Sequence, residues 1–174
     1  MTTLVAETGA GLSNANSYAG VTFADEYFAN HPFYADAWDD TDPYTKVSLL
    51  ISATTMLDIQ YLWHGVRKTT TQSLEWPRYR ARDQYDTLIA DDIVPLRVKQ
   101  ACCEQAYFLT KGDRAYDAQA STGLDKLKID VIELDFSSSP SLGRTQPVSS
   151  AVRGLLRGLG DYVNGMRVRK VIVG

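Results

Sequence analysis

Residues 42–62 read DPYTKVSLLISATTMLDIQYL and residues 95–111 read PLRVKQACCEQAYFLTK, and these two segments decide the fold. Both repeat apolar side chains close to the i, i+3, i+4, i+7 spacing of a helix with one buried face. The first helix carries Val47, Leu50, Ile51, Thr54, Leu57 and Leu62 on this spacing. The second carries Leu96, Val98, Ala101, Cys102, Gln105, Ala106, Phe108 and Leu109. We therefore expect two amphipathic helices at the centre of the protein.

The ends of both helices carry recognisable signals. Asp42 can accept hydrogen bonds from the first free backbone N–H groups, and Pro43 has the fixed φ that suits the first helical position. The second helix is predicted to begin at Pro95 and to end at Gly112. Between them, Leu74-Glu75-Trp76-Pro77-Arg78 cannot continue a helix through its proline. The two helices and this loop are predicted to form the core.

Weaker patterns flank this core. A short helix is predicted from Thr22 to Asn30, and an ordered aromatic loop over residues 31–41. Uneven alternation of apolar and polar residues predicts one or two strands within residues 124–136. A Ser- and Pro-rich linker then leads to a helix over residues 151–159 and a basic strand over residues 166–173.

These elements predict a mainly α fold, a small helical bundle with a short β element and an extended C-terminal tail. Residues 1–136 are predicted to form the helical body with its short β segment. Residues 137–174 are predicted to form the linker, the short helix and the C-terminal β tail.

Composition restricts the classes of protein that remain. The 174 residues are 44% hydrophobic and 22% charged, which is ordinary for a globular chain of one domain, or of one domain with an extension. No apolar run is long enough to span a membrane, and Met1-Thr2-Thr3 does not open a signal peptide. We expect no membrane association and a protein that is made in a cytoplasm.

The residue types needed for catalysis or metal binding are scarce. Cys102 and Cys103 are adjacent, so they are read as small buried residues rather than as a disulfide, and His31 and His64 are isolated. The sequence contains none of the phosphate-binding loop, dinucleotide-binding, zinc-protease or serine-hydrolase motifs. We therefore expect no enzyme activity, no catalytic residues, no metal ion and no cofactor.

Charge is distributed unevenly along the chain. From Ser141 onward there are six basic residues and one acid, a net charge of +5, whereas the first 140 residues hold twelve basic and twenty acidic residues, a net charge of −8. The basic tail is therefore expected to contact nucleic acid, an acidic protein surface or the acidic body of an identical neighbour. Its strand could add to another subunit or pair with residues 124–136. The predicted partner-binding residues are Arg153, Arg157, Arg167, Arg169 and Lys170.

A second candidate surface surrounds the tryptophan loop. Arg78, Arg80 and Arg82 follow Trp76 closely, and basic residues interleaved with aromatic rings can bind single-stranded nucleic acid by stacking and phosphate contacts. The same pattern also describes an exposed loop anchored in the core by Trp76. Interspersed acids such as Glu75 and Asp83 weaken the case for phosphate binding.

Several segments together resemble a family of tailed-phage proteins, over roughly residues 14–112. The most specific are Leu74-Glu75-Trp76-Pro77-Arg78 and Ile93-Val94-Pro95-Leu96-Arg97-Val98-Lys99-Gln100-Ala101. They are preceded by Asn16-Ser17-Tyr18, Phe23-Ala24-Asp25-Glu26-Tyr27-Phe28 and Leu50-Ile51-Ser52-Ala53-Thr54 with Leu57-Asp58. Members of this family are often labelled "putative DnaT-like single-stranded DNA binding protein", and their arrangement is similar to that of small head-tail connector proteins.

The resemblance implies a structural virion protein, a head-tail connector (adaptor) at the head-tail interface. Such adaptors form a dodecameric ring under the portal protein, contact the tail or a further connector protein, and let packaged DNA pass through the lumen without sequence-specific binding. The alternative that the family label implies is a replication accessory protein that binds single-stranded DNA, with Trp76, Arg78, Arg80 and Arg82 as the contact residues.

Overall fold

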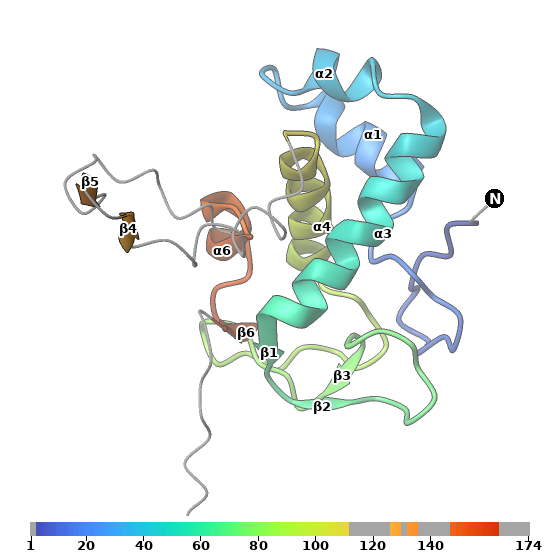
Figure 1. Ribbon diagram of the computed structural model, residues 1–174. Coiled ribbons are helices and arrows are strands. Elements are labelled where there is room, and N and C mark those ends of the chain that lie inside the picture. The colour runs from blue at the N-terminus through green and yellow to red at the C-terminus, as the bar shows by residue number, and fades with distance from the viewer. Residues whose placement is uncertain (1–2, 112–125, 130–131, 136–146, 164–174) are drawn as a thin grey trace, which may run out of the picture.

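The computed structural model describes residues 3–111, 126–129, 132–135 and 147–163 (Figure 1). Its helices are α1 (Val21–Ala29), α2 (Ala35–Asp39), α3 (Pro43–Gln60), α4 (Leu96–Leu109) and α6 (Ser150–Leu155). Its strands are β1 (Tyr61–Trp63), β2 (Val66–Arg67), β3 (Arg78–Tyr79), β4 (Lys126–Ile129), β5 (Ile132–Asp135) and β6 (Gly160–Tyr162).

The long helix α3 begins as its sequence predicts. The Asp42 carboxylate accepts hydrogen bonds from the backbone N–H groups of Tyr44 and Thr45, at 3.0 and 3.1 Å. Pro43 occupies the first helical position, where its missing N–H has no partner to lose. The helix ends at Gln60 because Tyr61 takes an extended conformation and starts β1. The predicted start is therefore confirmed.

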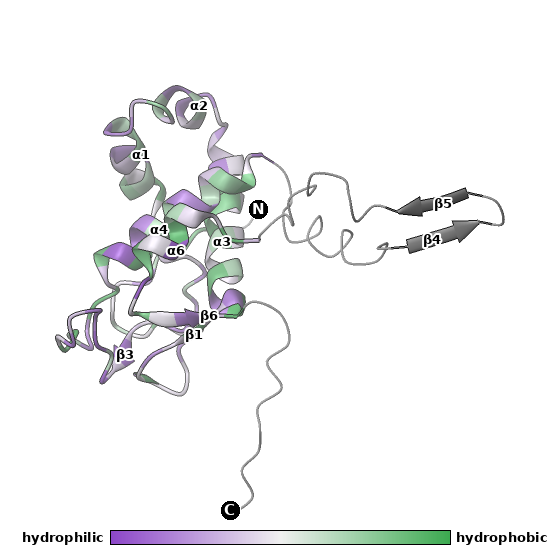
Figure 2. Cartoon of the chain, turned by 90° about the vertical axis from the view of Figure 1, so that its left-hand side faces the viewer, coloured by the Kyte–Doolittle hydropathy of each residue, from purple (hydrophilic) through white to green (hydrophobic). Residues whose placement is uncertain are grey.

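Helices α3 and α4 pack against each other at the centre of the fold. α3 buries Leu50, Ala53, Thr54 and Leu57, and α4 buries Val98, Ala101, Cys102, Cys103, Gln105 and Ala106. The Cys102 Sγ lies 3.3 Å from the Thr54 Oγ1, so a weak polar contact crosses an otherwise apolar interface. Figure 2 shows hydrophobic and hydrophilic stretches along both helices, as expected where one face is buried.

The described strands form three two-stranded antiparallel sheets. In the first, β1 pairs with β6, with Tyr61 opposite Tyr162 and Trp63 opposite Gly160. In the second, β2 pairs with β3 across the tryptophan loop. In the third, β4 pairs with β5 as a hairpin, which lies within the region where one or two strands are predicted.

The prediction of a small helical bundle is wrong. Only α3 and α4 are long helices within the described residues, and α2 and α6 have five and six residues. Non-helical segments supply much of the core, namely Ala15, Tyr18, Ala19, Leu74, Trp76, Ala81, Val94 and Val148. Because these loops are buried, the fold is a crossed helix pair with an irregular loop-and-sheet layer at one end (Figure 1).

The described part of the predicted C-terminal region lies against the body. Ser149 caps α6 by accepting a hydrogen bond from the Val152 backbone N–H at 3.2 Å. Helix α6 packs on α4 and buries Val152, while Leu156 and Leu159 follow it into the same core. The division at residue 136 stays a prediction. The tail strand over residues 166–173 and most of the linker lie outside the described residues.

Candidate nucleic-acid interface

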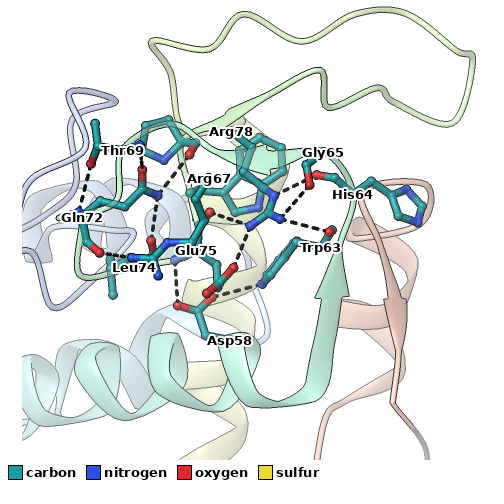
Figure 3. A network of polar contacts seen from close by, with 12 residues as sticks. Asp58, Trp63, His64, Gly65, Arg67, Thr69, Gln72, Leu74, Glu75 and Arg78 are labelled. Carbon is teal, nitrogen blue, oxygen red and sulfur yellow. Dashed lines mark hydrogen bonds and ion pairs between the residues drawn. The ribbon is translucent and has the colours of Figure 1, made fainter. Parts of the chain in front are cut away.

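Arg78 is the first residue of β3, directly after the loop that follows β2, and it is buried (Figure 3). Its Nε donates to the His64 carbonyl at 2.8 Å, and its Nη2 donates to the carbonyls of Gly65 and Trp63 at 2.9 and 3.3 Å. Its Nη1 donates to the Glu75 carbonyl at 3.0 Å and to the Glu75 Oε2 at 2.7 Å. We call this arrangement the Arg78 clasp. All the donor nitrogens of Arg78 are occupied, so its guanidinium has no free donor to offer a phosphate.

Trp76 is fully buried beside this clasp. Its ring packs edge-on against Trp63 with centroids 5.9 Å apart, and its backbone N–H donates to the Tyr18 hydroxyl at 3.3 Å. With 0% of the side chain exposed, neither face of the ring is open to a base. Trp76 is thus a core residue in this structure, the second of the two interpretations that the sequence leaves open.

Asp58 joins α3 to the loop through a buried carboxylate (Figure 3). Its Oδ1 accepts hydrogen bonds from the Tyr18 hydroxyl at 2.5 Å and from the Trp63 indole at 3.1 Å. Its Oδ2 accepts one from the Glu75 backbone N–H at 3.2 Å. Burial raises the pKa of Asp58 to about 6, although these hydrogen bonds act in the opposite direction. Burial also raises the pKa of Tyr18 well above its ordinary value, so Tyr18 remains a donor.

Gln72 fixes the remainder of the loop. Its amide nitrogen donates to the carbonyls of Leu74 and Pro77 at 2.8 and 3.1 Å, and its amide oxygen accepts from the Thr69 backbone N–H at 2.8 Å. Arg67 donates to the Gln72 carbonyl. The loop is therefore held by an internal polar network and forms a rigid platform under β3.

The outer face of this platform is aromatic and basic. Val66 and Tyr79 are 63% and 43% exposed, and with Arg80 they line a surface hollow of about 390 Å³. We call these three residues the β2–β3 surface. Arg80 has a φ of 56°, in the left-handed region that non-glycine residues rarely adopt, which turns the chain directly after the strand. Tyr85, 76% exposed, follows in the next turn.

The four residues predicted to contact nucleic acid therefore divide into two pairs. Trp76 and Arg78 lie inside the protein, whereas Arg80 and Arg82 are exposed. Arg82 is engaged by Asp86, with its Nη1 2.6 Å from the Asp86 carbonyl and 3.4 Å from the Asp86 carboxylate. Among the four, Arg80 has the guanidinium least occupied by contacts within the protein.

Sequence reasoning missed Val66, Tyr79 and Tyr85 as surface residues. The signal that could have found Tyr79 is strand alternation, because successive side chains of a strand point to opposite faces. Once Arg78 is buried, Tyr79 must point outward. Val66 pairs with Tyr79 across the two-stranded sheet, and no pattern in the local sequence predicts that pairing.

The basic residues predicted for partner binding are only partly described. Arg153 is half-buried on α6, with its Cζ 5.7 Å from the centre of the Tyr162 ring. Arg157 is exposed in the turn after α6. Arg167, Arg169 and Lys170 lie outside the described residues.

The described residues contain neither a metal-binding cluster nor a helix that could span a membrane. Over the described ranges, no three His, Cys, Asp or Glu side chains gather in a way that could hold a metal ion. None of the helices in the same ranges has the length and apolar character needed to cross a bilayer.

Comparison with known proteins gives one match. No curated protein and no solved structure matches the chain. A family model described as "Putative DnaT-like ssDNA binding protein" matches residues 2–172. Because this match covers nearly the whole chain, from the N-terminal arm to the basic tail, the protein belongs to that family.

Proposed function

We propose that the protein binds single-stranded DNA through the β2–β3 surface. The observation that carries this proposal is an exposed tyrosine at the end of β3, next to an arginine that has no ion pair among the described residues, at the rim of an open hollow. The family description supports the same function. In this proposal the contact residues are Tyr79 and Arg80, with Arg82 and Tyr85 beside them, and not Trp76 and Arg78.

The chemistry of these side chains suits a single strand. A base that stacks on an exposed aromatic ring contributes about 1–3 kcal/mol and does so with little sequence preference. The Arg80 guanidinium can contact the adjoining phosphate. With Arg80 and Arg82 as the exposed cations of this proposal, we expect one or two phosphate contacts. This number corresponds to a slope of log K against log salt of about −0.7 to −1.4.

Oligonucleotide binding measured by fluorescence anisotropy tests this proposal. The full chain should bind a labelled single strand at 150 mM salt. Tyr79→Ala should weaken binding by roughly tenfold or more, as loss of one stacked base predicts. Tyr44→Ala is the control, because Tyr44 is also an exposed tyrosine, lies at the far end of α3 and should bind as wild type. Binding that appears only at very low salt would reject the proposal.

A second candidate function is that of a subunit in a head-tail connector ring. The opposite charges of the segments at the two ends of α3 favour it. Residues 21–45 hold six acids and no Lys or Arg, whereas residues 61–82 hold five basic residues and one acid. Each end also exposes apolar side chains, Phe33 and Tyr44 at the acidic end and Leu62, Val66 and Tyr79 at the basic end. The 18 residues of α3 separate them by about 27 Å.

Complementary patches at opposite ends of one molecule produce head-to-tail contacts, and such contacts close into rings when the rotation allows. In this proposal twelve copies form a ring under a portal protein. The basic residues of the tail, from Arg153 to Lys170, contact the portal, and DNA passes through the lumen. No catalytic step is assigned in either proposal.

Two measurements separate the candidates. Protein counting in purified virions should find about as many copies as portal subunits if the connector proposal holds, and none if the protein acts only in replication. Mass photometry of the pure protein should give discrete oligomers for a ring subunit. The charge-reversed variant Arg80→Glu should then reduce assembly, whereas Arg80→Lys, which keeps the positive charge, should assemble as wild type.

A further inference from the structure

Two buried hydrogen-bond donors lie without acceptors where β1 meets β6 and α6. They are the Tyr61 hydroxyl and the Arg153 Nε. Tyr61 is only 4% exposed, so solvent does not serve its hydroxyl. The two other unpartnered buried donors in the described residues, Arg67 Nε and Trp76 Nε1, belong to the segment between β2 and β3. The β1–β6 pair is therefore a separate feature.

The side chains of both donors lie beside Tyr162. Tyr61 and Tyr162 are direct partners in the antiparallel β1–β6 pair, and their ring centroids lie 5.6 Å apart. The Arg153 guanidinium lies over the same Tyr162 ring, with its Cζ 5.7 Å from the centroid. One phenol and one guanidinium thus flank a single ring.

The position of Arg153 follows from α6. Val152 is buried in the core, and the next residue points about 100° further around the helix, toward β6. Within the described part of the chain, Arg153 has no carboxylate at ion-pair distance, and its guanidinium lies over the Tyr162 ring. A half-buried cation that lacks a counter-ion is unusual, because buried charges are normally paired.

Burial raises the pKa of Tyr61 to about 12, and the positive charge of Arg153 acts in the opposite direction on Tyr61 and on Tyr162. Tyr61 therefore stays protonated at neutral pH and keeps its O–H donor. The cluster therefore holds a neutral hydroxyl and a cationic N–H group that have no hydrogen-bond partner within the described residues.

We propose that Tyr61 and Arg153 form a binding site for an anionic oxygen ligand, a phosphate or carboxylate group. Such a ligand supplies the missing acceptor to both side chains and the missing counter-charge to Arg153. The guanidinium fork matches the geometry of these anions, and hydrogen bonds to charged oxygens are the strong ones. The proposal does not depend on the β2–β3 surface and stands whether or not that surface binds DNA.

Thermal unfolding of the full chain in sodium phosphate, sodium acetate and sodium chloride at equal ionic strength tests the proposal. Phosphate or acetate should raise the Tm relative to chloride, and the rise should saturate with concentration as expected for one site. A rise with phosphate identifies a phosphate group as the ligand, and a rise with acetate alone identifies a carboxylate. A Tm that is the same in all three salts, or that climbs without saturating as general salt exclusion produces, would overturn the proposal.

Two variants and one control assign the effect to this cluster. Tyr61→Phe removes the unpartnered hydroxyl, so its Tm in chloride should equal or exceed that of wild type while the rise with phosphate or acetate disappears. Arg153→Gln should also abolish the rise. Arg157→Gln, an exposed arginine four residues along the chain, should keep it. A lower Tm of Tyr61→Phe in chloride would mean that the hydroxyl already has a partner, and would reject the site.

Discussion

Two buried regions of this protein, the α3–α4 contact and the Arg78 clasp, are held together by different forces. The helix contact excludes water from aliphatic side chains such as Leu57 and Val98. In the clasp, the guanidinium of Arg78 donates hydrogen bonds to backbone carbonyls, and the indole of Trp76 is buried beside it. The comparison teaches that a short loop can be as much a part of the core as a long helix when one side chain completes its hydrogen bonds.

The largest expected effect comes from breaking the clasp. Arg78→Ala leaves several buried carbonyls and the Glu75 carboxylate without a donor, so we expect unfolding free energy to fall by about 4 kcal/mol. Arg80→Ala, two residues away and exposed, should stay within about 0.5 kcal/mol of wild type. Urea denaturation checks both. Similar losses in the two variants would show that the clasp contributes little.

Breaking the helix contact should have a slightly smaller effect. Leu57 is fully buried on α3, and Leu57→Ala should cost about 3 kcal/mol through lost burial and a residual cavity. Ile59 lies on the same helix and is 67% exposed, so Ile59→Ala should cost less than about 1 kcal/mol. A loss at Leu57 that greatly exceeds the loss at Arg78 would reverse the ranking of the two regions.

The pH dependence of stability sharpens the comparison, because Asp58 beside the clasp is, among the described residues, the carboxyl group whose pKa is raised by burial. The pKa of Asp58 is about 6 in the folded protein and near 4 when unfolded. The stabilising contribution of the protonated group is therefore complete below about pH 4, and it is lost as pH rises through about 6. Relative to Asp58→Asn, wild type should lose at most about 1.4 kcal/mol per pH unit in that window.

Parallel urea titrations of the two proteins at pH 4, 5, 6 and 7 provide the measurement. Asp58→Asn changes the hydrogen bonds around position 58 equally at every pH, so a constant gap between the two stability curves carries no information. The change of that gap with pH reports the pKa of Asp58. A difference that does not vary with pH would show that Asp58 keeps an ordinary pKa.

The smallest expected effect comes from removing the cap of α6, the short helix that packs on α4. Ser149 caps α6, which packs on α4, and Ser149→Ala should lower stability by about 1 kcal/mol. Ser150→Ala, at the exposed neighbouring position, should be close to neutral. Calorimetry of the two variants tests whether this short helix contributes to the global transition. Equal Tm values would show that α6 unfolds separately from the helix pair.

The parts of the fold that could be predicted are those with local signals. The start of α3 follows from Asp42 and Pro43, and the burial of Leu50, Thr54 and Leu57 follows from side-chain periodicity. The same periodicity places Leu62 on the helix, whereas it lies in β1 and is 53% exposed. The bundle was predicted wrongly because the core is completed by loops whose burial depends on distant partners. The pairing of β1 with β6 joins residues about one hundred positions apart, and no local pattern encodes it.

The candidate site shows the same limit. The arginine-rich segment after Trp76 could be recognised from sequence, but the division between buried Arg78 and exposed Arg80 could not. That division depends on carbonyls of Trp63, His64 and Gly65, which lie 13 to 15 residues earlier in the chain. Composition identifies the basic residues, whereas their availability to a ligand is decided by tertiary hydrogen bonds.

The opposite charges at the two ends of α3 have a kinetic consequence. Residues 21–45 and 61–82 carry net charges of −6 and +4, so the molecule is an electric dipole about 27 Å long. Such a dipole orients approaching charged partners, another copy included, before they touch. Added salt shortens the range of this orientation to about 10 Å at 0.1 M. Association should therefore slow as ionic strength rises, while complexes that have already formed dissociate at nearly unchanged rates.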